Sequence, residues 1–266
     1  MRKILILLFL LTAGFIHSQT PGDIITDRPD QTESTDILQP GYVQIETGVM
    51  HERIPDDGIG FYLSEESSIY ISTLIRIGVF ENLELRIAPE YGIINNRSRY
   101  ELDPEWYEQK SEGFTPLVLG TKIKIVAERL HSPALSFLFN IDLPEIAGKD
   151  FKSSYTTPEV RLAIAKELSD RFGLGVNVGA EFNMALGETN GLYTVALGLG
   201  LLDNLSGFIE FYGFFRQYSK NTHFLDGGLT YLIQKNIQLD LSAGTGLTDF
   251  TQDYFISGGL SVRLPR

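Results

Sequence analysis

Apolar and polar residues alternate along most of the chain after residue 41. In the stretch 237–247, Leu239 and Leu241 alternate with Gln238, Asp240 and Ser242, and the stretch 254–264 follows the same rule. A period of two over about ten residues indicates β-strands with one apolar face and one small or polar face. The pattern therefore predicts an all-β protein.

The alternation predicts about twelve strands. They are expected at 42–50, 68–80, 83–92, 114–127, 134–143, 157–168, 172–184, 191–202, 207–216, 223–233, 237–247 and 254–264. Most of these stretches are about 10 to 13 residues long, whereas strands of soluble domains average about 5 or 6. Pro89 interrupts the third stretch, which predicts a bulge or a local break there.

Short and long connections alternate along the chain. The short ones are 81–82, 128–133, 169–171, 203–206 and 234–236, and the long polar ones include 51–67, 93–113 and 144–156. Bacterial outer-membrane barrels have short periplasmic turns and longer extracellular loops. The pattern therefore favours a transmembrane antiparallel up-and-down β-barrel, residues 42–266, with both ends of its wall at the periplasm.

Alternation alone fits a secreted β-sandwich or β-solenoid as well, because only the buried face differs. Strand length and the Gly and Ser on the polar face favour the membrane barrel. The start of the chain adds an export signal: Arg2 and Lys3 precede an apolar run, 4–16, and Ser18 suits cleavage. We predict a cleaved signal peptide at 1–18 and a location in the outer membrane of a Gram-negative bacterium. An uncleaved anchor is the alternative, but the run is short for a spanning helix.

Residues 19–41 show no strand period and are rich in acidic side chains. We weigh a solvated periplasmic tail against a plug-like segment folded into the barrel mouth. The apolar residues Ile24, Ile25, Ile37 and Leu38 favour the plug. Its candidate residues are Asp27, Arg28, Asp30 and Glu33, and the expected partners of Arg28 are Glu84 and Glu167. The acidic spacing fits no calcium-binding EF-hand loop.

The polar face of the predicted strands carries charges of both signs, which are the candidate lumen-lining residues. They are Glu46, Arg76, Glu84, Arg86, Glu90, Lys122, Lys124, Asp142, Glu159, Arg161, Glu181, Glu210, Asp226, Asp240 and Arg263. Either they neutralise one another in a filled interior, or they line a polar pathway with an acidic bias.

Composition narrows the chemistry. A formal charge of -12 argues against nucleic acid as a partner, and the chain has no Cys for disulfides or thiolate chemistry. The mature chain has His51, His131 and His223, placed in turns or at the rim, and no G-x-S-x-G motif. We therefore expect no enzyme, no cofactor and no metal site.

The motif TDRPDQTES at 26–34, followed by QPGYVQIETGV at 39–49, resembles the outer-membrane β-barrel family named after the meta-pathway of phenol degradation, whose members are often described as transporters. The resemblance implies a passive channel for small molecules, aromatic or hydrophobic ones among them, with outer-membrane lipid, an unidentified solute and the outer-membrane assembly machinery as partners. The alternative is a structural or surface-binding barrel with a closed lumen. The chain departs from the usual aromatic C-terminus, ending in Leu264, Pro265 and Arg266, which weakens the expected assembly signal.

Overall fold

The computed structural model describes residues 22–54, 62–100, 105–248 and 251–265. The predicted signal peptide, 1–18, lies outside the described residues. Within them, no helix is long and apolar enough to cross a membrane.

Within the described ranges, fourteen stretches of β-structure form one antiparallel sheet. They are β1 (Tyr42–Ile54), β2 (Tyr62–Phe80), β3 (Leu83–Ala88), β4 (Glu90–Tyr100), β5 (Tyr107–Phe114), β6 (Leu117–Val126), β7 (Ala134–Leu143), β8 (Glu159–Glu167), β9 (Phe172–Asn183), β10 (Glu188–Leu202), β11 (Leu205–Phe215), β12 (Thr222–Gln234), β13 (Ile237–Gly246) and β14 (Tyr254–Pro265). A 3₁₀ turn at Pro144–Ile146 follows β7.

The fourteen stretches make twelve wall strands. Both β3 and β4 pair with β2, because they are one strand interrupted at Pro89. Likewise β5 and β6 are consecutive parts of one strand, interrupted at Thr115 and Pro116. Proline lacks the N–H that a ladder needs, so both breaks fall where the chain loses a donor. The predicted break at Pro89 and the expected strand number are confirmed.

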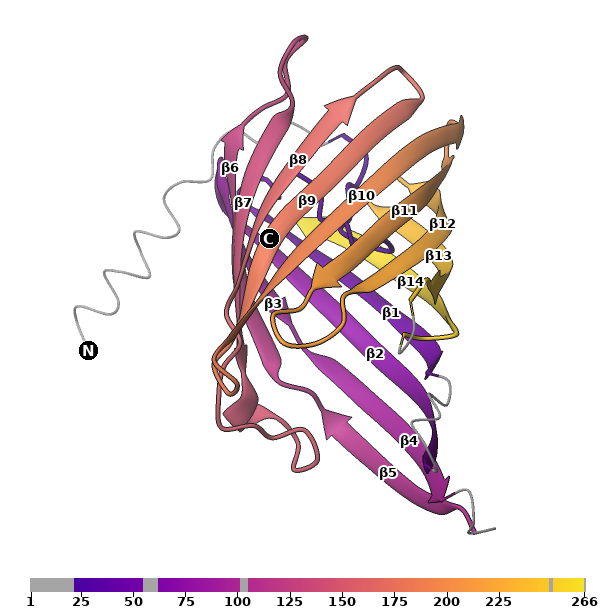
Figure 1. The fold of residues 1–266 in the computed structure, drawn as a ribbon. Coiled ribbons are helices and arrows are strands. Elements are labelled where there is room, and N and C mark those ends of the chain that lie inside the picture. Colours follow the sequence, from indigo (N-terminus) through magenta and orange to yellow (C-terminus); the bar gives the residue numbers. More distant parts are fainter. Residues whose placement is uncertain (1–21, 55–61, 101–104, 249–250, 266) are drawn as a thin grey trace, which may run out of the picture.

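The first and last strands close the wall. β1 pairs with β2 on one side and with β14 on the other, in a register that runs from Tyr42 opposite Pro265 to Arg53 opposite Tyr254. Figure 1 shows the resulting cylinder of tilted strands. Closure leaves the wall without an open edge along this seam, which is the condition for a sheet to span a membrane.

The barrel has two different ends. Tight connections between β2 and β3, β10 and β11, and β12 and β13 lie at the end where β1 begins, called here the short-turn end. The opposite, long-loop end carries the 144–158 connection and the projecting hairpin of β4 and β5. The predicted contrast between short turns and long connections is confirmed.

Two predicted loops are partly wrong. β2 begins at Tyr62 instead of 68, and the expected loop 93–113 is largely the hairpin of β4 and β5. Pairs such as Asn95 with Lys110 and Arg97 with Glu108 show why the period failed there. Both faces of this hairpin carry polar side chains, so the ladder continues without an apolar face to mark it.

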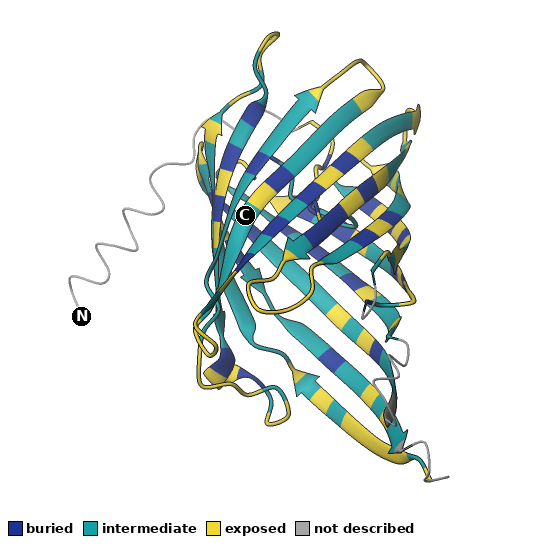
Figure 2. Cartoon of the chain, viewed as in Figure 1, coloured by how far each residue is buried: buried dark blue, intermediate teal, exposed yellow. Residues whose placement is uncertain are grey.

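The faces of the wall are inverted relative to a soluble barrel. Large apolar side chains such as Val49, Phe139 and Leu241 are exposed on the outside, whereas Glu46 and Arg76 are almost completely buried. Figure 2 shows buried and exposed residues alternating along the strands. An apolar exterior around a polar interior is the arrangement of a transmembrane barrel.

Candidate functional site: the lumen and the N-terminal segment

The N-terminal segment, residues 22–41, contains neither helix nor strand and runs inside the barrel. Its backbone is bound by small polar side chains of distant strands. Ser136 Oγ on β7 donates to the Thr35 carbonyl at 2.6 Å, and Asn177 Nδ2 on β9 donates to the Glu33 carbonyl at 3.1 Å. Because these strands lie away from β1, the segment crosses the interior.

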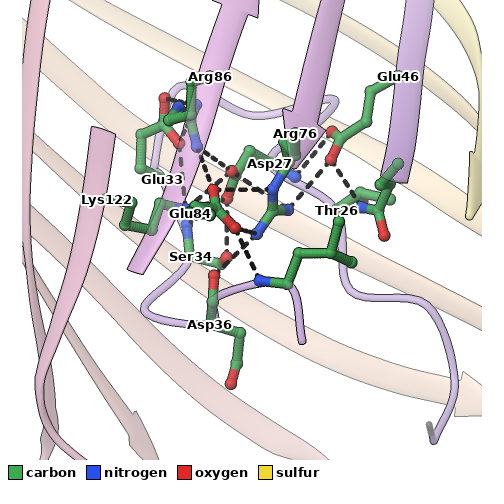
Figure 3. A network of polar contacts seen from close by, with 12 residues as sticks. Thr26, Asp27, Glu33, Ser34, Asp36, Glu46, Arg76, Glu84, Arg86 and Lys122 are labelled. Carbon is green, nitrogen blue, oxygen red and sulfur yellow. Dashed lines mark hydrogen bonds and ion pairs between the residues drawn. The ribbon is translucent and has the colours of Figure 1, made fainter. Parts of the chain in front are cut away.

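The carboxylate of Asp27 is the centre of the contacts between the segment and the wall. Lys122 Nζ on β6 lies 2.9 and 2.8 Å from its two oxygens, and Arg86 Nη1 on β3 lies 2.6 Å from Oδ2. Arg76 Nη1 on β2 lies 3.3 Å from the same oxygen. Figure 3 shows these cations converging on Asp27 from neighbouring strands.

These cations decide the ionisation of Asp27. Burial alone raises the pKa of a carboxyl group, because it penalises the charged form. Here the charges of Arg76, Lys122 and Arg86 outweigh burial and hold the pKa of Asp27 well below its ordinary value. Asp27 is therefore an anion in the docked segment.

Glu33 is a second carboxyl group of the segment that contacts these cations. Its two carboxylate oxygens lie 2.7 and 2.8 Å from Arg86 Nη2, and its backbone N–H donates to Asn177 Oδ1 at 2.8 Å. Burial raises the pKa of Glu33, and the nearby positive charge of Arg86 opposes that rise. The segment thus brings two carboxyl groups to one set of cations.

Two wall carboxylates complete this cluster and also hold the segment's backbone. Glu46 Oε1 lies 3.1 Å from Arg76 Nη1, while its Oε2 accepts the backbone N–H groups of Asp27 and Arg28 at 2.9 and 3.1 Å. Glu84 pairs with Arg76 at 3.0 Å and accepts the Leu38 N–H at 2.8 Å. Every ion in the cluster therefore has several partners, as buried charges require.

Arg28 contacts a different set of strands. Its Nη2 lies 3.1 Å from Asp240 Oδ1 on β13 and 3.0 Å from Ser257 Oγ on β14, and its Nη1 lies 3.3 Å from Ser72 Oγ on β2. A Cβ added at Gly48 would collide with the guanidinium, and one at Gly259 would lie 2.7 Å from Arg28 Nε. The two glycines, opposite each other in β1 and β14, make room for the side chain.

The predicted partners of Arg28 are therefore wrong. Glu84 is engaged by Arg76 and Arg86, and Glu167 lies exposed beside the short turn after β8. Local sequence does not distinguish among the carboxylates near the mouth, whereas the segment passes deeper, to the level of Asp240.

Acidic groups meet at the tip of the segment. Glu210 Oε2 on β11 accepts the Gln31 N–H at 2.6 Å, and its Oε1 accepts the Thr32 hydroxyl at 2.5 Å. Asp226 on β12 stands opposite Glu210 in the register, and the two buried carboxyl groups contact each other. Burial, and then the charge of Glu210, raises the pKa of Asp30 well above its ordinary value.

The other lumen candidates make local contacts. Arg161 pairs with Glu159 at 2.9 Å and donates to the Gln31 carbonyl at 3.1 Å. Further contacts are Lys124 with Asp36 at 3.1 Å, Arg263 with the carbonyls of Gly22 and Asp23, Glu90 with Thr115, Asp142 with the Thr157 N–H, and Glu181 opposite Glu159 in the register.

Small polar side chains, which are not among the predicted lumen residues, also bind the segment. These are Ser72, Ser136, Asn177, Thr194 and Ser257. The alternation of polar and apolar positions places them on the same face of the strands as the charged candidates. What the alternation does not give is which strands face each other across the lumen.

Two cavities adjoin the segment. One, of about 310 Å³, is lined by Asp36, Leu38, Tyr42, Gln44 and other residues near the short-turn end. The other, of about 230 Å³, is bordered by Arg28, Glu33, Glu46, Ser72 and Arg86, and by Asn140, farther along the wall. Residues of the segment therefore line both cavities.

Two of the histidines singled out in the sequence make local contacts, and the described residues form no metal-ligand cluster. No three His, Asp or Glu residues are grouped there so as to hold a metal ion. His223 Nδ1 lies 2.7 Å from the Tyr193 hydroxyl, among the rings of Phe211 and Phe215 on the outward face. His51 Nδ1 contacts the Ser68 carbonyl.

The family follows from a match along the barrel and most of the segment. The model of the family described as "Putative MetA-pathway of phenol degradation" matches residues 26–264. The chain belongs to this family. The predicted resemblance is thereby confirmed, and the match begins inside the segment, at Thr26, two residues before Arg28.

Solved structures share the fold at low sequence identity. The COG4313 outer membrane channel from Pseudomonas putida F1 superposes with a TM-score of 0.63 at 10% identity, covering 86% of this chain and 98% of that one. The transport unit of the autotransporter AIDA-I from Escherichia coli gives 0.56 at 10% identity, covering 98% and 96%. The NanC porin gives 0.51 at 8% identity, covering 84% and 100%. None of the curated proteins compared with the chain matches it.

Proposed function

We propose that the chain is an outer-membrane channel for small solutes, with the N-terminal segment as a displaceable constriction in its lumen. The proposal is carried by one observation: the interior of the barrel is polar, and hydrogen bonds and ion pairs make most of the contacts that hold the segment there. The short-turn end faces the periplasm, since the segment enters there directly after the expected signal peptide. Outer-membrane lipid surrounds the apolar face, and the outer-membrane assembly machinery inserts the barrel.

Displacement of the segment is physically reasonable because water can replace most of its contacts. Ile24 and Leu38 are its buried apolar side chains, whereas Ile25 is 49% exposed. The remaining contacts are polar. A neutral hydrogen bond contributes only about 0.5–1.5 kcal/mol net, and one to a charged group about 1.5–3 kcal/mol, because water competes for the same groups. The wall, in contrast, is held by a continuous backbone ladder that does not involve the segment.

The lining favours solutes that form hydrogen bonds. Arg28, Glu33, Glu46, Ser72 and Arg86 border the cavity on the long-loop side of the Asp27 cluster. The family description points towards aromatic degradation, and the proposal that aromatic or hydrophobic molecules are carried rests on that description alone.

One observation favours the second candidate, a structural or surface-binding barrel with a closed lumen. The segment contacts β2, β3, β6, β7, β9, β11 and β13, so it fills the interior from several sides. A permanently docked segment would make the barrel a closed scaffold. The two candidates therefore differ in whether the segment leaves.

A reversible tether tests this difference. Thr32 Oγ1 and Thr194 Oγ1 lie 2.6 Å apart, and the chain contains no Cys. Side chains this close are candidates for a disulfide, whose Cβ atoms lie about 3.5–4.5 Å apart. The variant Thr32→Cys/Thr194→Cys, reconstituted in planar bilayers, is expected to conduct when reduced and to lose its larger conductance states when oxidised. Thr194→Cys alone is the matched control.

Deletion of residues 20–38 behind the intact signal gives the complementary measurement. Liposomes containing the folded deletion variant should swell faster in isosmotic solutes than liposomes with the full chain. If the folded variant is no more permeable than empty vesicles, the channel proposal fails and the closed-lumen barrel is favoured.

A further inference from the structure

The lumen has a basic wall and an acidic wall. Arg76, Arg86 and Lys122 lie on β2, β3 and β6, which are consecutive in the barrel. Glu210, Asp226 and Asp240 lie on β11, β12 and β13, also consecutive. The strands β7 to β10 separate the two groups on one side, and β1 and β14 separate them on the other. The two groups therefore face each other across the barrel.

Each wall has a net charge of its own sign after the ion pairs within that wall are counted. The basic wall includes Glu46 and Glu84, which leaves its three cations with one positive charge in excess. The acidic wall has no cation of its own, because β11, β12 and β13 contain no Lys or Arg. Asp226 is only 4% exposed and lies beside the carboxyl group of Glu210, its partner in the register. A cationic group supplied from the lumen would satisfy this wall.

The segment bridges the two walls with opposite charges. Asp27 binds the basic wall, while the next residue, Arg28, reaches Asp240 on the acidic wall. The Gln31 N–H and the Thr32 hydroxyl also donate to Glu210. Asp30 is the exception in sign, but burial and Glu210 raise its pKa well above the ordinary value, which favours the uncharged carboxyl there.

The site that holds the Arg28 side chain is complementary in shape to a planar cation. Asp240 and Ser257 accept hydrogen bonds from one nitrogen of the guanidinium, and Ser72 accepts one from another. Gly48 and Gly259 leave the space that its plane occupies. Asp240 Oδ2 has no hydrogen-bond partner in the described part of the chain, so one acceptor remains available.

We propose that the lumen, once the segment is displaced, selects small zwitterions, with the carboxylate on Arg86 and Lys122 and the guanidinium or ammonium group at Asp240. This inference rests on the proposed channel function and names its substrate class. The segment occupies both subsites with the side chains of Asp27 and Arg28, so its docking and the binding of such a solute exclude each other.

The first test compares solutes in liposomes that contain the variant lacking residues 20–38. The zwitterion 4-guanidinobutyrate carries the two charged groups of Asp27 and Arg28, and xylitol is an uncharged solute of similar size. The zwitterion is expected to permeate about two- to fivefold faster, because ion pairs exposed to water change an equilibrium constant by about this factor. Asp240→Asn and Lys122→Met should each remove this preference, whereas Glu128→Gln, in a short turn, should keep it.

Ion selectivity gives an independent readout of the two walls. In a KCl gradient, Asp240→Asn should shift the reversal potential of the deletion variant towards anion selectivity, and Lys122→Met should shift it towards cation selectivity. Equal permeation of zwitterion and xylitol, together with unchanged reversal potentials in both variants, would overturn the inference while leaving a working channel. A folded barrel that passes no solute would refute the channel function and, with it, this inference.

The full chain provides a test that does not depend on the deletion. In Thr32→Cys, the thiol reacts with a bulky maleimide only when the segment leaves the wall. Millimolar 4-guanidinobutyrate should accelerate this reaction, because it competes with Asp27 and Arg28 for their sites. Equal concentrations of guanidinium chloride or sodium butyrate should have a smaller effect, and xylitol none. Equal labelling rates with all four solutes would contradict the zwitterion site.

Discussion

At the scale of single residues, Asp27 and Asp30 lie close in the chain but have opposite electrostatic surroundings. Arg76, Lys122 and Arg86 lower the pKa of Asp27, whereas burial and Glu210 raise that of Asp30. A group whose pKa is lowered by docking stabilises the docked segment above its free pKa and loses this effect as the pH falls through the docked value. A group whose pKa is raised stabilises docking at low pH instead.

The sign of the Asp30 shift gives a testable pH dependence. Its contribution to docking is complete below the free carboxyl value of 3.8 and is lost as the pH rises through the raised docked value. The open probability of the full-length channel in bilayers should therefore increase towards alkaline pH. Asp30→Asn should flatten this increase, because the asparagine side chain does not ionise. Asp23→Asn, at an exposed position, is the control, and an unchanged pH profile in Asp30→Asn would contradict the assignment.

Neighbouring residues on one strand test the two faces. Phe139 is 37% exposed on the outer surface, whereas the next side chain, Asn140, donates to Glu159 inside the barrel at 3.1 Å. Phe139→Arg is expected to impair insertion, because a charge at the bilayer midplane costs about 2–4 kcal/mol in such barrels. Asn140→Arg should be milder. Heat-modifiable migration of both variants, refolded into lipid, measures the difference, and equal effects would refute the face assignment.

At the scale of elements, docking of the segment depends on glycines in the wall, which have no side chain. Gly48 and Gly259 give space to Arg28, and a Cβ at Gly78 would collide with the backbone at Gln39. These glycines therefore serve close approach between the segment and β1, β2 and β14. The N-terminal segment and the wall are complementary surfaces, although the segment has no regular structure of its own.

A single methyl group tests this complementarity. Gly48→Ala is expected to expel Arg28 and weaken docking by about 1–3 kcal/mol, the usual cost of overpacking a filled site. Limited proteolysis within the segment should become faster, and conductance should rise. Gly173→Ala is the matched control, since a Cβ there meets nothing within 4 Å. If both variants resist protease equally, the glycine at 48 has no role in docking.

The sequence predicted the strands and the polarity of their faces because both follow from a period of two. This period can be recognised without information about distant contacts. It failed at β4 and β5, where both faces are polar and pairing alone maintains the strands. It also failed for Arg28, whose partner Asp240 lies 212 residues away. Which strands face each other depends on barrel closure, and local patterns carry no information about that.

At the scale of the whole molecule, the wall and the segment are held by different forces. The wall closes through the pairing of β1 with β14, while the segment adds charge pairs between strands that are not neighbours. The ladder is complete without the segment, so the barrel should persist when the segment leaves. A channel requires this independence, because the opening must not unfold the wall.

The deletion of residues 20–38 tests the independence of the wall. The variant should still migrate as a folded barrel on unheated gels, but its heat-induced unfolding should occur at a lower temperature. The reason is electrostatic: without Asp27 and Glu33, the cations Arg76, Arg86 and Lys122 retain only Glu46 and Glu84. One positive charge is then left without a partner in a lumen that fills with water.

Removal of that charge should restore part of the stability. Adding Lys122→Met to the deletion variant is expected to raise its unfolding temperature, by an amount that corresponds to about 1 kcal/mol or less for a hydrated charge. In the full chain the same substitution should have the opposite effect. There it removes the 2.8 Å contact with Asp27 and leaves a buried carboxylate with fewer partners, a loss of up to about 3–5 kcal/mol. A Lys122→Met variant that destabilises both backgrounds equally would show that Lys122 supports the wall itself and not the docked segment.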